Sequence, residues 1–479
     1  MHIFNFSSRF NIITGVVSAA TLFLGVFAFF LIDYNMKYSV YFILFFVVAS
    51  FYIMSESQVL KVSSVLFLLV FVENILVYNR YFLDVFIVGI SVVFALMLVF
   101  LSTRNIGRLG GIYFQGYCWL FFLILSFLTI FLTDGLTLDL FYEQLIIFQM
   151  KYVEFFLFFL VGYLAFDEIE DVDKFLKVII LFCCLVAITH IFSLITGYNI
   201  EGIRGAEAVT QERDLADEKN WRYGGVFGNP NYMAAFYTMV APVCLIVFIN
   251  ERKYLYKILS ALAVCLLFLS VSTTGSRGGV VFVVTNILLL LAYYKASVAN
   301  KTKYLLCLLI FLIFSYFMVE IFFSEFLYRS LERISQIDVA QDVRWDMWLS
   351  TLQMIFQNPF GIGLLPESFG FRLYNDIGVY LGHPHNAYLY LIVSNGVIGF
   401  LLFARIVYVQ LKKTFQNTRE YSGEKLVYIN YCIIALILGF MLSGLVNGAF
   451  INNYKLNHVF ALFLGLSAFV NHKYGERDV

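Results

Sequence analysis

Runs of apolar residues long enough to cross a bilayer recur from one end of the chain to the other. A membrane-spanning helix needs roughly 20 such residues to cross ~30 Å of hydrocarbon. The pattern predicts about fourteen spans. Their approximate bounds are 12–32, 38–54, 60–78, 82–101, 112–132, 145–166, 175–196, 232–249, 255–272, 278–294, 304–323, 386–408, 428–449 and 455–471. The second is short and could form one re-entrant unit with the third, so we expect an all-α polytopic membrane protein with about twelve to fourteen transmembrane helices.

Composition agrees with this class, because 61% of the residues are hydrophobic and 13% are charged, against about 25% charged in soluble domains. The zero net charge excludes a broadly basic nucleic-acid-binding protein. All seven cysteines lie within apolar runs, which indicates neither an external disulfide framework nor a metal site. The first apolar run lacks a signal-peptide cleavage pattern, so we expect it to be the first span.

Lysine and arginine are concentrated in alternate connections between the predicted spans. These residues are Arg104, Arg108, Lys174, Lys177, Arg252, Lys253, Lys295, Lys301, Lys303, Arg405, Lys412, Lys413, Arg419, Lys425, Lys473 and Arg477. The intervening connections, such as 133–144, are acidic or poor in lysine. By the positive-inside tendency, both termini then lie inside. Two long polar loops, 197–231 and 324–385, and the turn 273–279 lie outside, so the polar chemistry is concentrated on the outer face.

This topology divides the chain into four regions. They are N-terminal transmembrane helices over 1–196, transmembrane helices with external motifs over 197–323, a large external loop over 324–385, and C-terminal transmembrane helices with a short inner tail over 386–479.

The first long loop ends in "RYGGVFGNPNYMA" (222–234). Its glycines allow tight backbone paths, and Asn-Pro-Asn predicts a turn followed by a helix cap at Asn231. One interpretation is a well-formed entry into the next span. The other is an anion pocket lined by Arg222 and exposed amides.

A second candidate is Arg277, in "STTGSRGGVVF", because an arginine in a short external turn runs against the positive-inside tendency. It either reaches the membrane surface as an ordinary charge or binds an anion such as phosphate. The small neighbours Ser276, Gly278 and Gly279 leave room for a ligand to approach.

The stretch "DVRWDMWLSTLQMIFQNPFGIG" (342–363) predicts an amphipathic helix lying on the membrane, with tryptophans at headgroup depth. Its apolar positions at helical spacing are Trp345, Trp348, Leu349, Leu352, Ile355 and Phe356. Asp342 is expected to cap it, and Asn358-Pro359 with Gly361 to end it. Arg344 is either an interfacial charge or projects into a site.

The second long loop ends in "GHPHN" (382–386) directly before an apolar run. Asn386 is expected to cap the span and Pro384 to set the entry angle. Two histidines here favour a functional role, because a neutral imidazole takes up a proton near neutral pH. No carboxylate stands at a metal-ligand spacing from His383 and His385, which disfavours a metal site.

Several polar residues fall inside predicted spans, where they are costly unless paired. They are Glu73, Lys151, Glu154 and His190. Lys151 and Glu154 stand three apart on one helix, so we expect them to pair. His190 and His458 are expected to be packed and hydrogen-bonded.

Taken together, these motifs resemble the O-antigen ligase/polymerase superfamily, over roughly residues 222–403. The stretches that carry the resemblance are "RYGGVFGNPNYMAAF", "STTGSRGGVVF", "RWDMWLSTLQMIFQNPFGIGL" and "HPHNAYLYLIVSNGVIGF". The resemblance implies a GT-C-type membrane glycosyltransferase in the bacterial inner membrane, with cytoplasmic termini and a periplasmic active site. It implies an undecaprenyl-diphosphate-linked glycan donor, a lipid A-core or lipid-linked glycan acceptor, contacts with membrane lipid and other polysaccharide assembly proteins, and no metal or other cofactor.

Carried over by position, the resemblance assigns His385 as the base or acceptor-orienting residue and Arg277 and Arg344 as diphosphate clamps. Arg222 is a third cation. The substrate-binding set is Arg222, Asn229, Asn231, Ser276, His383 and Asn386.

The acceptor separates the alternatives within the superfamily. A ligase transfers finished polysaccharide to the lipid A core, and a polymerase extends a lipid-linked repeat unit. The HxHN and GNPN forms favour the ligase. A transporter or lipid flippase is an alternative of another class, but its polar site is expected near the midplane, whereas the polar motifs here lie at outer helix ends.

Overall fold

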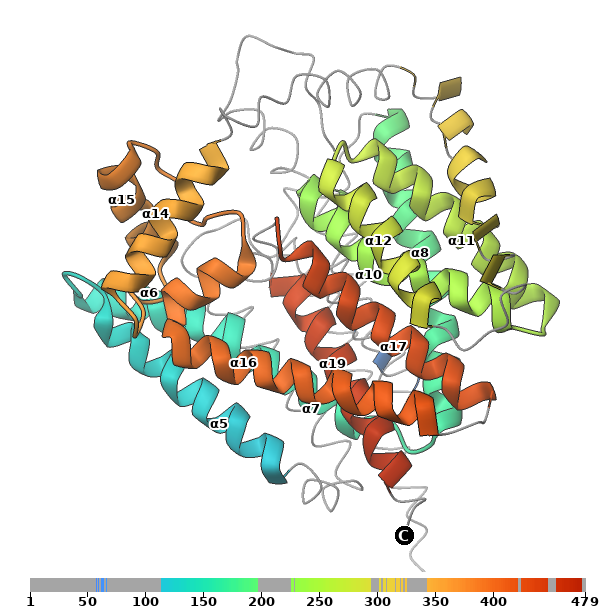
Figure 1. The fold of residues 1–479 in the computed structure, drawn as a ribbon, viewed down its shortest axis with the longest axis horizontal. Coiled ribbons are helices and arrows are strands. Elements are labelled where there is room, and N and C mark those ends of the chain that lie inside the picture. The colour runs from blue at the N-terminus through green and yellow to red at the C-terminus, as the bar shows by residue number, and fades with distance from the viewer. Residues whose placement is uncertain are drawn as a thin grey trace, which may run out of the picture. The chain divides into compact units, whose positions relative to one another are not determined.

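In the computed structural model, every element among the described residues is a helix (Figure 1). The structure describes 113–196, 225–227, 229–293, 343–420, 424–446 and 454–475, with isolated positions between 57 and 66 and between 301 and 324. The chain forms two units, Met1–Ile87 and Val88–Val479. The elements below belong to the second unit, and the first four predicted spans lie outside the described residues except for isolated positions in the third.

The elements follow one another in a simple order along the chain. They are α5 (Tyr113–Leu128), η4 (Thr129–Leu132), α6 (Leu138–Phe148), η5 (Gln149–Val153), α7 (Glu154–Leu164), α8 (Ile169–Thr196), η6 (Gly225–Phe227), α10 (Pro230–Asn250), α11 (Tyr254–Thr273), α12 (Arg277–Tyr293), α14 (Val343–Gln357), α15 (Pro366–Ile377), α16 (Ala387–Glu420), α17 (Glu424–Ser443) and α19 (Tyr454–Gly475).

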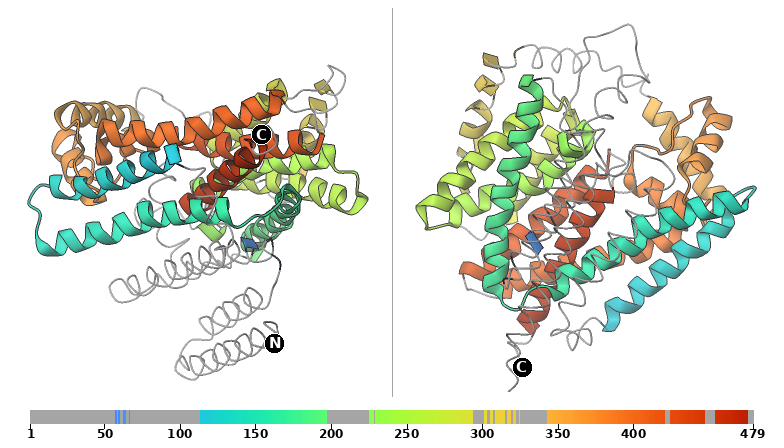
Figure 2. Two further views of the ribbon diagram at one scale, coloured as in Figure 1. Left: turned by 90° about the horizontal axis from the view of Figure 1, so that it is seen from below. Right: turned by 180° about the vertical axis from the view of Figure 1, so that it is seen from behind.

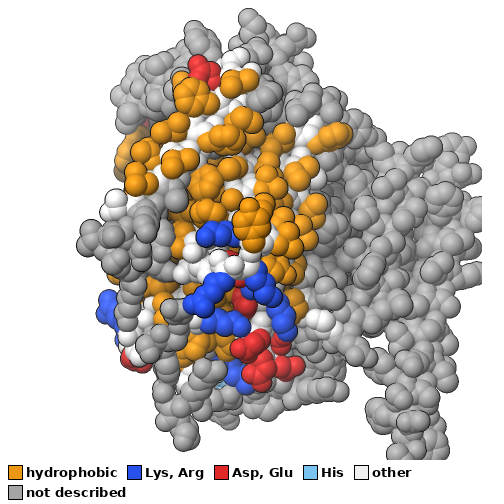
Figure 3. Space-filling view, turned by 90° about the vertical axis from the view of Figure 1, so that its right-hand side faces the viewer, with side chains coloured by type: hydrophobic (Ala, Val, Ile, Leu, Met, Phe, Trp, Pro, Cys, Tyr) orange, Lys and Arg blue, Asp and Glu red, His pale blue; other side chains and the backbone are white. Residues whose placement is uncertain are grey.

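Six helical segments are long and apolar enough to cross a membrane, which confirms the predicted all-α polytopic membrane protein. They are Leu138–Leu164, Ile169–Phe192, Pro230–Asn250, Tyr254–Thr273, Ala387–Glu420 and Lys425–Ser443. Shorter apolar helices cover Gly116–Leu132 and Gly278–Tyr293. Large apolar side chains such as Leu255 and Val281 are exposed on these helices, and one face shows a broad hydrophobic band with charged side chains gathered towards one end (Figure 3). Such a band suits contact with lipid.

Close helix contacts depend on small residues and on buried amides. A Cβ at Gly162 of α7 would overlap the carbonyl oxygen of Leu462 in α19, so these two helices approach closely along their length (Figures 1 and 2). The buried amide of Asn286 in α12 donates to the carbonyl oxygens of Thr238 in α10 and Ala435 in α17, both at 2.9 Å. Small residues and polar bridges of this kind hold helices together in lipid, where apolar burial contributes little.

Connections that are predicted to lie on the same side of the membrane meet in the structure. Lys177 of α8 pairs with Glu251, which follows α10, at 2.7 Å, and Asp173 accepts from Lys177 at 3.0 Å and lies 3.6 Å from Lys425 of α17. All three connections are predicted to lie inside. Of the connections predicted to lie outside, the 133–137 turn contacts α15 through an Asp134–Arg372 ion pair.

Helix α16 is broken at Gly396, where φ is 73° and ψ is 168°. Backbone groups released by the break bond to the loop after α14: the amide of Ile362 donates to the carbonyl of Val393 at 2.9 Å, and that of Val397 donates to the carbonyl of Pro359 at 3.0 Å. The span predicted over 386–408 is present within Ala387–Glu420, and the break inside it is a feature that the sequence pattern did not predict. The break depends on a segment about 35 residues earlier in the sequence, and irregular backbone is tolerated in a membrane only where protein satisfies it.

The amide of Gln144 in α6 holds the inserted loop. Its oxygen accepts from the Leu364 amide at 3.0 Å, and its nitrogen donates to Thr133 at 2.6 Å. The "NPFGIG" stretch therefore ends α14, as predicted, and also fills the break in α16.

The predicted amphipathic helix is confirmed as α14, which packs against α15 and the start of α16 (Figure 1). Its exposed apolar residues are Trp345, Leu349, Leu352 and Phe356. Ile355 was predicted to share this face but is buried, because α14 packs on other helices through the side that also carries Met347 and Met354. Asp342, the predicted cap, lies outside the described residues.

Candidate functional site

Asn386 caps α16, as the sequence predicts. Its side-chain oxygen accepts from the amides of Tyr388 and Leu389, each at 3.0 Å, and its nitrogen donates to the Leu445 carbonyl, also at 3.0 Å. The cap satisfies orphan amides of the first turn. It also ties the start of α16 to the end of α17, so the preceding histidines are held at a defined place.

His385 has a left-handed backbone conformation, with φ at 51°. Among the described residues, every other positive φ belongs to glycine. This conformation costs a residue with a Cβ roughly 1–2 kcal/mol, and it persists only where surrounding contacts impose it. Such strain is commonly found at functional sites.

Contacts on both sides of Pro384 impose the conformation. The His385 amide donates to His383 Nδ1 at 3.2 Å, and the two rings lie 4.4 Å apart at 72°. From α14, Trp348 Nε1 donates to the Pro384 carbonyl at 2.8 Å. Contacts from α14 and within the segment therefore fix the backbone of the His-Pro-His segment.

His383 is held in its neutral form. Burial, followed by the nearby charges of His385 and Lys151, lowers the pKa of His383 from 6.5 to about 3. Its Nδ1 accepts from the His385 amide, so the ring proton of the neutral form lies on Nε2. A histidine with this pKa and an occupied Nδ1 is a poor general base at neutral pH, which leaves His385 as the better candidate of the two.

Lys151 adds a cation for which the sequence predicted a different partner, Glu154. It lies on η5, a single π-helical turn, and its Nζ is 6.0 Å from the centroid of the Tyr390 ring. The predicted pair with Glu154 is wrong, because the buried Glu154 contacts His458 at 3.3 Å and among the described residues Lys151 has no ion pair. In η5 the Glu154 amide bonds to the Gln149 carbonyl, five residues back, and this wider turn changes which side chains share a helix face.

The predicted packing of two histidines within spans is confirmed. His190 is buried, with its Nε2 3.1 Å from Thr273 Oγ1. His458 is buried, with its Nε2 3.0 Å from the Met150 carbonyl.

Of the three candidate arginines, Arg344 is the one whose side chain lies among the described residues. Arg344 lies in the first turn of α14, is exposed, and stands one helical turn from Trp348, which contacts Pro384. Arg277 is the first residue of α12, and its side chain lies outside what the structure describes. Arg222 also lies outside the described residues. Convergence of these cations on His385 therefore stays a prediction.

The Asn-Pro-Asn turn begins α10 two residues earlier than predicted. Asn229, not Asn231, is the cap: its side-chain oxygen accepts from the Asn231 amide at 2.8 Å, and Pro230 is the first helical residue. Proline suits this position because its φ is helical and it lacks an amide hydrogen that would need a partner.

A buried lysine supports this motif from another helix. Lys455, in the first turn of α19, donates to the carbonyl of Val226 in η6 at 3.1 Å. The sequence predicted no role for Lys455, although a lysine at the start of an apolar run was an available signal.

The serine of the SRG motif acts locally as a helix cap. The Gly279 amide donates to Ser276 Oγ at 3.4 Å at the start of α12. The expectation that Gly279 leaves room for a ligand is wrong: a Cβ there would lie 2.5 Å from the Cβ of Ala234, because α12 packs closely on α10.

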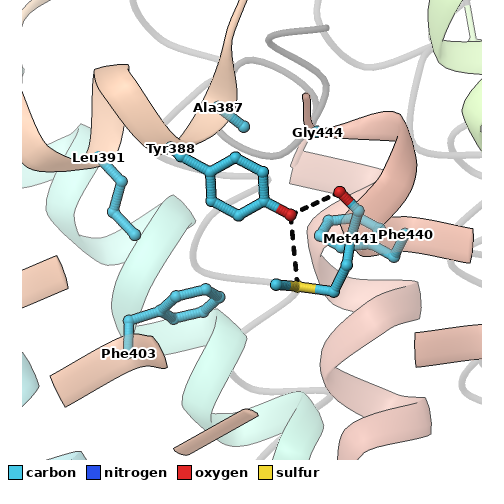
Figure 4. A pocket seen from close by; sticks show the side chains of 7 residues that line it. All are labelled: Ala387, Tyr388, Leu391, Phe403, Phe440, Met441 and Gly444. Atoms are coloured by element: carbon cyan, nitrogen blue, oxygen red, sulfur yellow. Dashed lines mark hydrogen bonds between the residues drawn. The ribbon is translucent and has the colours of Figure 1, made fainter. Parts of the chain in front are cut away.

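An apolar pocket lies next to the candidate site, between the two halves of α16 and α17 (Figure 4). Its lining residues are Ala387, Tyr388, Leu391, Phe403, Phe440, Met441 and Gly444, and its volume is about 10 Å³, room for a single water molecule. The Tyr388 hydroxyl points towards Met441 and donates to its carbonyl at 2.5 Å. No group of three or more His, Cys, Asp or Glu side chains within the described part of the chain could hold a metal ion.

The fold and the site together define a polytopic helical membrane protein with a strained histidine at the start of a broken helix. Residues 261–404 match the family model of O-antigen ligase, which supports the resemblance to the O-antigen ligase/polymerase superfamily. The match runs from α11 into α16 and includes Arg277, Arg344 and His385. It supports a membrane glycosyltransferase-like enzyme that acts on lipid-linked glycans. No curated protein sequence aligns significantly with the chain.

Proposed function

We propose that the protein is an O-antigen ligase-type glycosyltransferase of the GT-C class. It moves a glycan from undecaprenyl diphosphate to the lipid A core at the periplasmic face of the bacterial inner membrane. The observation that carries the proposal is the fixed left-handed conformation of His385 beside a neutral His383, within the segment that matches the family.

In the proposed reaction, His385 takes the proton of an acceptor hydroxyl as general base. The acceptor oxygen forms a bond to the anomeric carbon, the bond from that carbon to the diphosphate oxygen breaks, and undecaprenyl diphosphate departs with the bonding electrons. Arg277 and Arg344, with Arg222 as a third cation, stabilise the negative charge that develops on the diphosphate. No metal ion takes part in this scheme.

The remaining residues of the proposed site position groups rather than exchange protons. Asn386 and Asn229 cap α16 and α10, and Ser276 caps α12. Asn231 and His383 complete the proposed substrate-binding set. Each lies at or just before a helix start, where backbone amides favour an anionic ligand.

The break in α16 calls for a comparison with transporters, which often bind ions at discontinuous helices. In a transporter site, the released backbone groups are available to a ligand. Here the Val393 carbonyl and the Val397 amide both bond to the loop after α14. This occupancy favours an enzyme over a transporter.

The test is a His385→Ala replacement in the native host, with surface polysaccharide read on a gel. A bare core and accumulated lipid-linked polymer support the ligase. Core carrying a single repeat unit supports a polymerase, whose acceptor is a lipid-linked repeat unit. An unchanged profile contradicts the assignment of His385. The matched histidine control is His472→Ala, in the last turn of α19. This variant is expected to leave the profile unchanged.

A further inference from the structure

Lys151 stands inside a segment long and apolar enough to span the membrane, Leu138–Leu164. A lysine at such a place is expensive unless it is paired or has a function. It lies on the π-helical turn η5, and such turns are frequent at functional sites. The costly lysine and the distortion of the helix backbone therefore occur at the same position.

The surroundings of Lys151 leave its positive charge largely uncompensated. The Tyr390 ring, 6.0 Å from Nζ, is a weak partner for a cation at this distance. Glu367, exposed in the first turn of α15, is the carboxylate that acts on Lys151 electrostatically, but the two do not form an ion pair among the described contacts. His383 is close enough for the charge of Lys151 to act on it.

Tyr390 lies one helical turn after Asn386, the cap of α16, and His383 precedes that cap. These two neighbours place Lys151 near the His-Pro-His segment. Lys151 comes from α6–α7, outside the residues 261–404 that match the family model. Lys151 is half-buried as a residue, and water screens a charge at such a place less than at an open surface.

We propose that Lys151 is a further substrate-binding residue, whose ammonium group contacts a phosphate of a glycan–lipid substrate beside His383 and His385. The phosphate belongs either to the diphosphate of the donor or to a phosphorylated acceptor core. The inference rests on the proposed function, because that function brings such substrates to this site. Lysine suits the role as a point charge that neutralises phosphate.

The experiment measures the binding of two probes to the full-length protein in detergent: undecaprenyl diphosphate and lipid A-core. Lys151→Met is expected to weaken one of them by roughly ten- to a hundredfold, the range of a charged hydrogen bond, while Lys151→Arg retains most of the affinity. The weakened probe identifies the source of the phosphate. If Lys151 contacts a phosphate, binding by Lys151→Met must also depend less on salt concentration than binding by the wild type. A structural defect would not change the salt dependence in this way.

The control is Lys412→Met. Lys412 Nζ also lies 6.0 Å from a tyrosine ring, that of Tyr408, but on the exposed C-terminal half of α16. Binding of both probes by this variant is expected to equal that of the wild type. If the wild type binds neither probe, the proposed function fails, whatever the role of Lys151. If the wild type binds and Lys151→Met binds equally well, the inference about Lys151 is overturned alone.

A second variant covers the case in which Lys151→Met does not fold. Glu367→Gln changes an exposed side chain and removes the carboxylate that competes for Lys151. It is expected to tighten binding of the same probe by roughly two- to fivefold, the scale of an exposed charge interaction. Unchanged or weaker binding overturns the inference.

Discussion

The backbone amide of His385 donates to Nδ1 of His383 at 3.2 Å, across the intervening proline. This contact gives the two histidines different roles. His383 is a neutral acceptor that shapes the turn, and His385 is the residue whose backbone the turn strains. Removing either ring is therefore expected to have distinct effects on stability and on activity.

The first prediction concerns acid stability. Because the pKa of His383 is lowered from 6.5 to about 3 in the folded protein, the unfolded chain binds more protons between these values. The contribution of His383 to the free energy of unfolding is therefore fully present above pH 6.5 and is lost as the pH falls towards 3. His383→Asn keeps an acceptor but does not titrate, so its thermal unfolding temperature falls less between pH 7 and pH 4 than that of the wild type. An equal fall in both proteins contradicts the assignment.

The second prediction separates strain from catalysis at His385. Glycine adopts a φ of 51° without the steric cost of a Cβ, whereas alanine retains that cost. His385→Gly is therefore expected to be more stable than His385→Ala by about 1 kcal/mol, although both lose transferase activity. Thermal unfolding in detergent measures the difference. A glycine variant that is no more stable than the alanine variant argues against an imposed left-handed backbone.

The third prediction concerns the break in α16. At Gly396, φ is 73°, and an added Cβ would lie 2.6 to 2.9 Å from backbone atoms of Phe360. Gly396→Ala is expected to destabilise the protein by about 2 kcal/mol or more. Gly378→Ala is the matched control, because φ is 72° there and no atom lies within 4 Å of the new Cβ. Its smaller loss, about 1 kcal/mol, comes from the backbone alone. Equal losses for both variants refute a role for the overlap with Phe360.

The fourth prediction concerns the clamp from α14. Trp348→Phe removes the hydrogen bond to the Pro384 carbonyl and keeps an aromatic ring in place. Transfer of glycan is expected to slow several-fold, with donor binding almost unchanged, because the variant loosens the position of His385 without removing a cation. The control is Trp345→Phe, which changes an exposed side chain three residues earlier in α14. It is expected to retain the wild-type rate. Similar rates for all three proteins count against the clamp.

Several features follow from short stretches of sequence. The spans are predictable because an apolar run of sufficient length has few alternatives to a helix in a bilayer. The cap at Asn386 is predictable because it involves amides only two and three residues ahead. The cap at Asn229 is equally local, because Pro230, the next residue, is suited to the first position of a helix.

Other features depend on residues distant in the sequence, and only the tertiary structure decides them. The break at Gly396 requires the loop near Ile362 to supply hydrogen bonds. Glu154 pairs with His458, 304 positions later, which leaves Lys151 to face Tyr390. The neutral state of His383 arises from burial and from charges that the fold brings near it. Local patterns determine where helices begin and which residues carry chemistry, whereas burial and charge pairing depend on which helices pack together.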